Sequence, residues 1–544
     1  MGRRLSGLAV NLSLLALFLM LHPLSGSSPN SNPPDERASP QDPVLLRIGT
    51  TDLVQSANIL LDANLSLFAH VSNPTLMKMN QEIEPEGQLV EAIEASADLK
   101  TWTLTLKDDL FWSDGLPVTS ADVRFTLTYL RDKFPAAGWI KNTVSEISIV
   151  DRHTVVIRIN RPYGRLDFEF TTYPLLPQHV WETIENPLRH TNPGRIIGCG
   201  PFIIDRTDLN RGVVAMVRNP HWKGPESQID VVEIHLYKNR DVLALALERE
   251  DIDIFYEYAS SYPYVNLDRL RGSGRFEFLE QLNLGLYFLG FNLKKPPMSD
   301  PKFRRAVALA LDHEEILRLI LLDNGRKPQL GFIPPSMPAF KPTRECALDR
   351  KEAARMLDEA GCRDRNRDGL RELGGGKDLR LTLLVDPHKP FNARLSELVE
   401  EYLRAVGLRV SIKAVEGSSW VSLKDRYSYD LVISRTSPWG MLMHASWATG
   451  YFDARRTGEG VLHTVDDPKF LALCDDLLAE TDPGRFRSLA HRVQDYYAEN
   501  LPAVALLWNK IITPYNQDFY GWELDPLYGL FNIDTLLSVR RKQP

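Results

Sequence analysis

The sequence predicts an α/β protein with mixed or parallel sheets. A strand pattern at 379–385, a helical pattern at 393–407 and a second strand pattern at 408–415 follow one another. This order is typical of neighbouring strands joined by a helix. Apolar and polar residues alternate strictly at Trp102–Leu106, which predicts a half-buried strand. The chain has 544 residues, which is long for one domain and indicates two or three.

Helix starts are well marked. Four of them share an N-cap residue with a side-chain oxygen: Thr119, Asp300, Asp312 and Asp349. Asp122 completes a capping box with the first, and Pro301 stands at the first helical position after the second. We expect Gly325 and Gly361 to end the third and fourth helices, because glycine accepts the left-handed conformation found there.

The N-terminus has the pattern of a secretion signal. The first four residues, MGRR, are basic, and an apolar run follows them. His22 and Pro23 limit this run to about 15–18 residues, which is short for a transmembrane helix. We therefore expect residues 1–26 to be a signal peptide, cleaved near Gly26 or Ser27.

A Pro/Ser-rich segment follows the signal. Residues 27–43 are polar and are predicted to form a flexible leader. No cysteine directly follows the apolar run, so the sequence offers no site for a lipid anchor. We expect an exported protein, periplasmic or extracellular, that is not lipid-anchored.

Charge and motifs argue against several classes of function. The formal net charge is −7, whereas nucleic-acid binding needs basic patches. The sequence has no nucleophile elbow, zinc-binding H-E-x-x-H, phosphate loop or complete dinucleotide-binding glycine motif. Its 12 histidines include no pair at helical metal-ligand spacing. We expect no catalytic residues, no cofactor and no nucleic-acid partner.

The four cysteines leave one disulfide open. An oxidising compartment would permit a bridge between Cys346 and Cys362. The segment between them is predicted to be helical, which would hold the two cysteines too far apart unless its flanks fold back. The other two cysteines are Cys199 and Cys474.

One segment resembles part of a calcium loop. Asp364, Asn366 and Asp368 supply oxygens at positions 1, 3 and 5, and a glycine follows at position 6. Position 12 is Gly375, where a calcium loop needs a glutamate. The segment is therefore either a polar turn or a weak calcium site, which could also use Glu372.

Four blocks in the chain carry a family resemblance. They occur in order and cover a strand–turn–helix, a GCGPF turn with a later VRNPHWKG, an FNLKKPP connection before a helix, and a helix followed by DRNRDGLRE: Leu99–Leu127, Gly198–Gly224, Leu289–Leu317 and Leu348–Glu372. Together they resemble the extracellular solute-binding proteins of family 5, the peptide- and nickel-binding type that serves ABC importers.

The resemblance implies a two-lobed periplasmic-binding-protein-like fold of the cluster C type, with an inserted subdomain. The expected parts are lobe I, its insert and lobe II: residues 44–71 with 190–281 and 509–540, residues 72–189, and residues 282–508. Two crossing strands, at 282–292 and 504–510, would join the lobes. A small ligand would bind in the cleft, and closure would create the surface that a permease recognises.

The resemblance also implies partners: permease subunits and their ATPase, with the binding protein itself a monomer. Two other classes of function stay open. A ligand sensor or chaperone on the same fold would lack a permease, and an exported hydrolase would need a nucleophile and base that the sequence does not reveal.

The segment Arg435–Trp447, RTSPWGMLMHASW, is the candidate ligand site. Peptide-binding members of the family carry an aspartate here for the peptide amino group, but this chain has no acidic residue between Asp430 and Asp453. The spacing R-T-x-x-W-G instead resembles the nickel-binding branch, where the tryptophan lines the pocket of a chelated metal. The candidate ligand-binding residues are Arg435, Trp439, Met441, His444, Trp447 and, upstream, Trp420.

Three interpretations of this segment remain. It could pack in the core, or Met441, Met443 and His444 could bind a soft metal directly. We favour the third, in which Trp439 stacks on an organic or metal-chelate ligand while Arg435 or a neighbouring group pairs with the charge of that ligand.

The predicted export can be tested on the mature protein. We expect its N-terminus to lie near Gly26 or Ser27, with no attached lipid, in N-terminal sequencing or intact-mass measurement. A retained Met1 or a lipid-modified chain would contradict the prediction.

Overall fold

The computed structural model describes residues 43–134, 137–191, 196–374, 376–455, 462 and 464–542. The predicted signal peptide and, apart from Pro43, the predicted leader lie outside these residues. All described residues belong to one compact unit, Pro43–Pro544. Within its described part, every helix is too short or too polar to cross a membrane.

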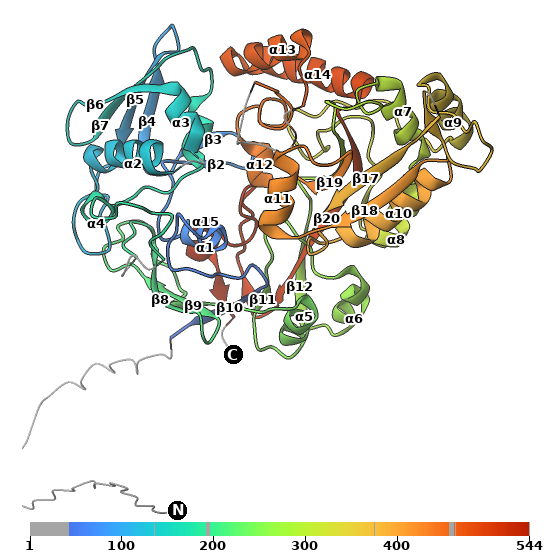
Figure 1. Ribbon diagram of the computed structural model, residues 1–544. Helices are drawn as coiled ribbons and strands as arrows, with labels where there is room; N and C mark the ends of the chain where they lie inside the picture. Colours follow the sequence, from blue (N-terminus) through green and yellow to red (C-terminus); the bar gives the residue numbers. More distant parts are fainter. Residues whose placement is uncertain are drawn as a thin grey trace, which may run out of the picture. The chain divides into compact units, whose positions relative to one another are not determined.

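A single long strand, β20 (Ala503–Asn516), joins two groups of strands (Figure 1). Its first half pairs antiparallel with β13 (Tyr287–Phe291), and its second half pairs antiparallel with β12 (Phe276–Leu282). Nearly every residue of β20 is buried, as expected for a strand with neighbours on both sides. The two strand groups therefore meet along one continuous backbone.

On the β12 side, the sheet continues from β20 through five strands. In spatial order they are β11 (Ile254–Phe255), β1 (Leu45–Thr50), β10 (Val231–Leu236), β9 (Val213–Arg218) and β8 (Phe202–Asp208). β1 runs parallel to both of its neighbours, whereas β9 and β8 are antiparallel. Helix α5 (Arg240–Glu248) packs against β1 and β11.

On the other side, β13 leads to β19 (Leu431–Arg435), β17 (Arg380–Val385) and β18 (Arg409–Ala414). β17 and β18 are parallel, and α10 (Asn392–Arg404) connects them while packing on the sheet. The predicted strand–helix–strand unit is confirmed. The mixed sheet as a whole confirms the predicted α/β class.

A separate four-stranded antiparallel sheet has the order β4 (Val90–Ala95), β5 (Thr101–Leu106), β7 (Thr154–Ile159), β6 (Val144–Ile149). Helix α2 (Ser120–Lys133) covers it. Trp102, Leu104 and Leu106 of β5 are buried, which confirms the predicted half-buried strand. These elements lie within the predicted inserted subdomain, 72–189, and we use that name for them. The lobe and subdomain boundaries themselves stay a prediction.

The remaining elements are short or lie around the sheets. In the first half of the chain they are α1 (Ala63–Ala69), β2 (Met77–Met79), β3 (Pro85–Gly87), α3 (Gly138–Thr143), η2 (Leu166–Thr171), α4 (Gln178–Trp181), η3 (Tyr264–Asn266) and α6 (Leu267–Gly272). In the second half they are α7 (Pro301–Ala310), α8 (His313–Leu321), β14 (Gly325–Arg326), α9 (Arg350–Glu359), β15 (Glu372–Leu373), β16 (Lys377–Asp378), α11 (Gly417–Asp425), α12 (Pro438–Leu442), α13 (Pro468–Ala479), α14 (Pro483–Asn500), β21 (Phe519–Tyr520), α15 (Ile533–Ser538) and β22 (Arg540–Arg541).

The predicted helix starts are confirmed at all four N-caps, including the capping box of Thr119. Gly361 follows α9 with a positive φ, as predicted. The predicted end of α8 at Gly325 is wrong: the helix stops at Leu321, and Gly325 lies in β14. Leu322 adopts the left-handed conformation itself, so no glycine is needed there.

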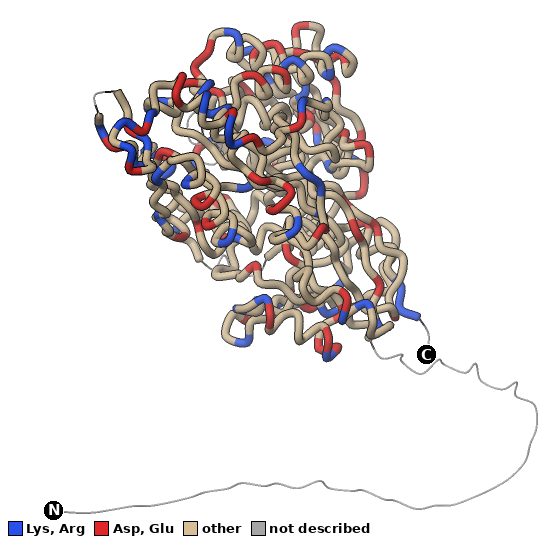
Figure 2. The backbone as a smooth tube through the Cα atoms, turned by 90° about the vertical axis from the view of Figure 1, so that its right-hand side faces the viewer, with Lys and Arg blue, Asp and Glu red and all other residues tan. Residues whose placement is uncertain are grey.

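The surface charges are mixed in sign, and the cysteines are unpaired. Acidic and basic residues intermingle over the face drawn in Figure 2. All four cysteines are free and buried, so the bridge left open between Cys346 and Cys362 does not form here. The Cys346 thiol instead lies 3.1 Å from the carbonyl oxygen of Ala308.

The inserted subdomain docks on α13 through a close backbone contact. The Gly164 N–H donates to the carbonyl oxygen of Leu478 at 2.7 Å. A Cβ atom on Gly164 would lie 2.4 Å from the backbone oxygen of Glu480, closer than such contacts permit. The Leu478 side chain packs into the hydrophobic core to which the buried residues of the subdomain contribute. Only glycine fits this junction.

We expect Gly164→Ala to lower the free energy of unfolding by about 1–3 kcal/mol, because the backbone must shift to relieve the clash. Chemical denaturation monitored by circular dichroism measures the change. Gly272→Ala is the matched control, since a Cβ there meets nothing within 4 Å, and it should leave stability nearly unchanged. Equal stabilities for the two variants would contradict this account of the junction.

Candidate functional site

The Arg435–Trp447 segment connects β19 to α12 and the turns that follow. Thr436 fixes its start, because its N–H donates to the Leu286 carbonyl at 2.8 Å and its hydroxyl accepts from Leu286 N–H at 2.9 Å. Ser437 is the N-cap of α12, with Pro438 at its first position. The predicted site residues on and around this short helix form two groups that contact different parts of the protein.

Arg435 points toward the strand group that contains β11. Its Nη1 lies 3.3 Å from the hydroxyl of Ser260, which follows β11 in the chain. Burial opposes the charge, but the Tyr287 hydroxyl and the Asp52 carboxylate outweigh it, so the pKa of Arg435 lies above its ordinary value. Among the residues that the structure describes, no carboxylate oxygen lies within 4.0 Å of this guanidinium.

Trp439 lies at the same junction. Its backbone N–H donates to the hydroxyl of Tyr258 at 2.9 Å, and the Tyr258 N–H in turn donates to Asp52 Oδ2 at 2.9 Å. The side chain of Trp439 is left 38% exposed, whereas Trp447 is buried. An exposed indole beside an arginine is suited to stacking on a ligand.

Sequence reasoning missed the partners of these two residues. Asp52 follows β1, Tyr258 and Ser260 follow β11, and Tyr287 stands opposite Arg435 in the β13–β19 register. One signal was available: the stretch IFYEYASSYPY is dense in tyrosine, as ligand-contacting loops often are. Nothing in the sequence linked it to Arg435.

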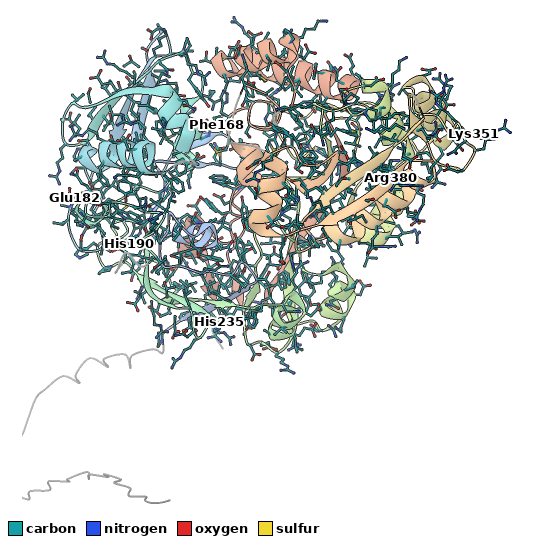
Figure 3. All side chains as sticks on the ribbon, viewed as in Figure 1. Phe168, Glu182, His190, His235, Lys351 and Arg380 are labelled. Atoms are coloured by element: carbon teal, nitrogen blue, oxygen red, sulfur yellow. The ribbon has the colours of Figure 1, made fainter. Side chains whose placement is uncertain are left out.

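Met441, His444 and Trp447 lie on another side of the segment. All three are buried, and they line a cavity of about 90 Å³ together with Phe168, Met337 and Phe486. The His444 ring stands between the rings of Phe168 and Phe486, with centroids at 5.6 and 5.3 Å. Phe168 comes from η2 of the inserted subdomain and lies at its side nearest α12 (Figure 3).

Trp420 stands apart from both groups. It lies in α11, half-buried against the core that contains Met441, and the ammonium of Lys424 is 5.9 Å from its ring centroid. The structure thus brings Arg435 near Trp439 and gathers Met441, His444 and Trp447 around one cavity, but it does not unite all six. Their roles in ligand binding stay predictions.

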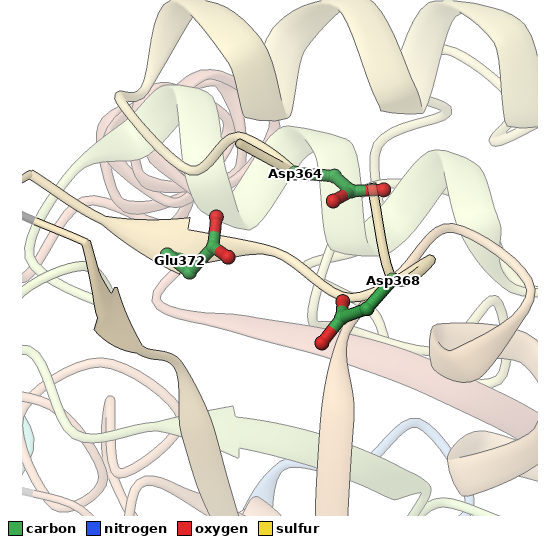
Figure 4. Close-up of side chains that lie close together, drawn as sticks. All are labelled: Asp364, Asp368 and Glu372. Atoms are coloured by element: carbon green, nitrogen blue, oxygen red, sulfur yellow. The ribbon is translucent and has the colours of Figure 1, made fainter. Parts of the chain in front are cut away.

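The candidate calcium loop lies elsewhere. Carboxylate oxygens of Asp364, Asp368 and Glu372 lie within 4.8 Å of one another (Figure 4). Each also accepts a backbone N–H of the loop, as in an ordinary polar turn, and Asn366 accepts from Asp368 N–H at 2.8 Å. Gly375 lies outside the described residues. Calcium binding stays a prediction.

The fold is that of a two-lobed binding protein. The chain belongs to the bacterial extracellular solute-binding proteins, family 5, whose middle-region model matches residues 84–457, more than half of the 544 residues. The resemblance inferred from the sequence is confirmed, and with it the two-lobed fold.

Several proteins are similar over most of their length. The probable D,D-dipeptide-binding periplasmic protein DdpA of Escherichia coli is 24% identical over 459 residues, covering 83% of this chain and 84% of its own. Two solved structures share the fold at a TM-score of 0.78. They are Bacillus subtilis AppA with a nonapeptide, 18% identical over 92% of this chain and 99% of its own, and Brucella suis NikA with Fe(III)-EDTA, 19% identical over 92% and 100%.

A group of polar and aromatic residues lies close enough to Tyr258 to interact with it electrostatically. The His70 and Tyr528 rings stack at 3.7 Å, and Asp525 Oδ1 accepts the N–H groups of Leu527 and Tyr528. Burial lowers the pKa of His70 to about 3 and raises the pKa of Asp525 to about 6, although the two backbone hydrogen bonds oppose the latter shift. Both groups are therefore neutral in mildly acidic conditions.

Asp525 predicts a pH dependence of stability. A carboxyl with a raised folded-state pKa holds its proton more tightly when folded. The native state is thus favoured below the unfolded value near 3.8, and this advantage is lost as the pH rises through about 6. Asp525→Asn keeps an oxygen for both backbone bonds but cannot ionise. We expect it to be more stable than wild type above pH 6, by roughly 1–3 kcal/mol.

The measurement is the free energy of unfolding of both proteins from pH 4 to 8. The difference between them should shrink toward pH 4, where Asp525 is protonated. A difference that does not change with pH would show that Asp525 ionises as it does in the unfolded chain.

Proposed function

We propose that this chain captures a small ligand with a negatively charged group in the cleft between its lobes, with Arg435 neutralising that group. As a member of its family, the chain is the substrate-binding component of an ABC importer, and its ligand is of the oligopeptide-like or chelated-metal class. The membrane permease and its ATPase would take over the ligand, and no chemical step on the ligand is proposed.

The Arg435 guanidinium is the observation that supports this proposal. A charge removed from water costs several kcal/mol unless an opposite charge compensates it. The oxygens next to Arg435 are the neutral hydroxyls of Ser260 and Tyr287, and the Asp52 carboxylate lies beyond ion-pair distance. Despite burial, Tyr287 and Asp52 hold the pKa of Arg435 above its ordinary value, so the guanidinium is charged without a direct anionic partner among the described residues. An incoming carboxylate would supply a bidentate partner, which guanidinium geometry favours.

The ligands of the relatives agree with an anionic group. The similar proteins carry names or bound molecules that include a D,D-dipeptide, a nonapeptide and Fe(III)-EDTA. Peptides and EDTA differ in shape, but both present carboxylates. The backbone N–H of Trp439 donates to the Tyr258 hydroxyl, and the exposed indole of Trp439 would stack on the organic part of the same ligand.

The family and the predicted signal support export, and we propose the periplasm as the site of action. One similar protein is periplasmic by name. A monomer is proposed because one chain supplies both sides of the cleft, Arg435 from β19 and Ser260 from beyond β11.

We expect Arg435→Gln to weaken ligand binding at least about 30-fold, since losing one partner of a buried charge pair costs roughly 2 kcal/mol or more. Trp439→Ala should weaken it by a smaller factor. Isothermal calorimetry against di- to pentapeptides, nickel chelated by histidine, and free Ni²⁺ identifies the ligand class and measures both effects.

Arg394→Gln is the matched control. Arg394 is exposed on α10 and pairs with Glu397 at 2.7 Å, so its loss should leave the affinity unchanged. Tight binding that persists in Arg435→Gln, or binding of free Ni²⁺ without a chelator, would count against an anionic ligand at Arg435.

A further inference from the structure

The cavity beside α12 has walls that are mostly apolar. Eight of its lining side chains are large and apolar. Five of these eight are buried, namely Phe168, Met337, Met441, Leu442 and Trp447, and three are half-buried, namely Ile83, Met443 and Phe486. Its volume is about 90 Å³. Mostly apolar walls favour an apolar guest over a polar one.

The charged residues of the cavity wall are partly engaged with one another. Arg165 Nη2 donates to Glu84 Oε2 at 2.5 Å, and the guanidinium also lies 4.6 Å from the ring centroid of Phe168. Arg487 is the third charged residue of the wall, and the methionine and aromatic side chains form most of the remaining surface that a guest would meet.

The methionines make the cavity adaptable. Met337, Met441 and Met443 are unbranched and polarizable, so they can adjust to guests of different outline. The rings of Phe168 and Phe486 both pack against His444 and line the same cavity. A flexible apolar wall with rigid aromatic sides suits an aliphatic group better than a fixed polar one.

The cavity has contributions from both sides of the cleft. Phe168 belongs to the inserted subdomain, whereas Met337, Met441 and Phe486 belong to the predicted lobe II. Hydrogen bonds between these sides include the Gly164 N–H donating to the Leu478 carbonyl and the Thr172 hydroxyl donating to Met443 Sδ at 3.2 Å, and the Phe168 and His444 rings also pack together. The cavity is therefore complete only while the subdomain is docked.

The cavity and the Arg435 junction share one segment of chain. Trp439 and Met441 are two residues apart in α12, about 3 Å along the helix axis, and face different ways. The cavity wall at Met441 is thus less than one helical turn from Trp439 along α12, on another face of the helix. Both places lie where lobe II meets the rest of the molecule.

We propose that this cavity receives an aliphatic side group of the ligand, of the size of a leucine or methionine side chain. This rests on the proposed function, and it narrows the ligand to a small anion with an apolar substituent. Burying such a group contributes about 1.5–3 kcal/mol, equivalent to roughly 10–100-fold in affinity.

The test compares tripeptides that differ only in this group: Gly-Gly-Gly and the three tripeptides that carry one leucine. Calorimetry on the wild-type protein should show a preference of about 10-fold or more for leucine at one position. Ala339→Leu fills the cavity from its own wall and should abolish the preference. Met443→Phe, a second filling variant, should do the same if the first folds poorly.

Ala393→Leu is the control, because it makes the same change on the exposed face of α10 and should preserve the preference. Xenon binding, followed by ¹²⁹Xe NMR, should be seen in wild type and lost in the filled variants. No leucine preference in wild type, or one that survives both filled variants, overturns the proposal.

The arginine variant distinguishes the apolar subsite from the anion site. Arg435→Gln should weaken all four tripeptides by a similar factor and leave the leucine preference intact. A leucine preference that is lost in Ala339→Leu, with affinities that do not respond to Arg435→Gln, would retain the apolar subsite and reject the anion site.

Discussion

The shared strand β20 is the constraint on which the architecture depends. Its first half hydrogen-bonds to β13 and its second half to β12. The two strand groups therefore cannot separate without breaking backbone hydrogen bonds of a buried strand. The change of partner falls near Asn509, which is buried and hydrogen-bonded to Asn283 through both backbone and side chain. A relative rotation of the lobes has to be absorbed around this pair of asparagines, because the strand segments on either side are held by their ladders.

The position of Arg435 follows from this arrangement. β19 lies next to β13, and its last residue therefore emerges beside the strand that borders β20. There the side chain reaches residues that follow β11, on the other strand group. A guanidinium at such a junction is partly desolvated, and among the described residues Asp52 supplies negative charge only at longer range. This charge and the Tyr287 hydroxyl keep the pKa of Arg435 above its ordinary value. This geometry supports our proposal that a carboxylate-bearing ligand binds Arg435 directly.

The inserted subdomain adds a second contact far along the chain from β20. Gly164 permits a backbone approach that any side chain would block, and Phe168 then closes the cavity beside α12. Closure at the two ends of the cleft would therefore be coupled, since the same Arg435–Trp447 segment meets Tyr258 on one side and the subdomain on the other. A ligand that touches both would be held by polar and apolar forces together.

The sequence by itself determined the local structure and the family. Caps at Thr119, Asp300, Asp312 and Asp349, and the period-two strand at Trp102–Leu106, depend on neighbouring residues only, so they were readable in advance. Leu322 shows the limit even of local rules, since it took the left-handed turn expected of Gly325. Only the tertiary structure decided how the candidate site is divided. Residues two apart in a helix face different directions, so Trp439 meets Tyr258 while Met441 enters the core. Ser260 lies 175 positions from Arg435 in sequence, a separation at which no local pattern operates. Exposure and core packing differ from one residue of the segment to the next, because burial depends on which distant strand or helix the fold brings against it.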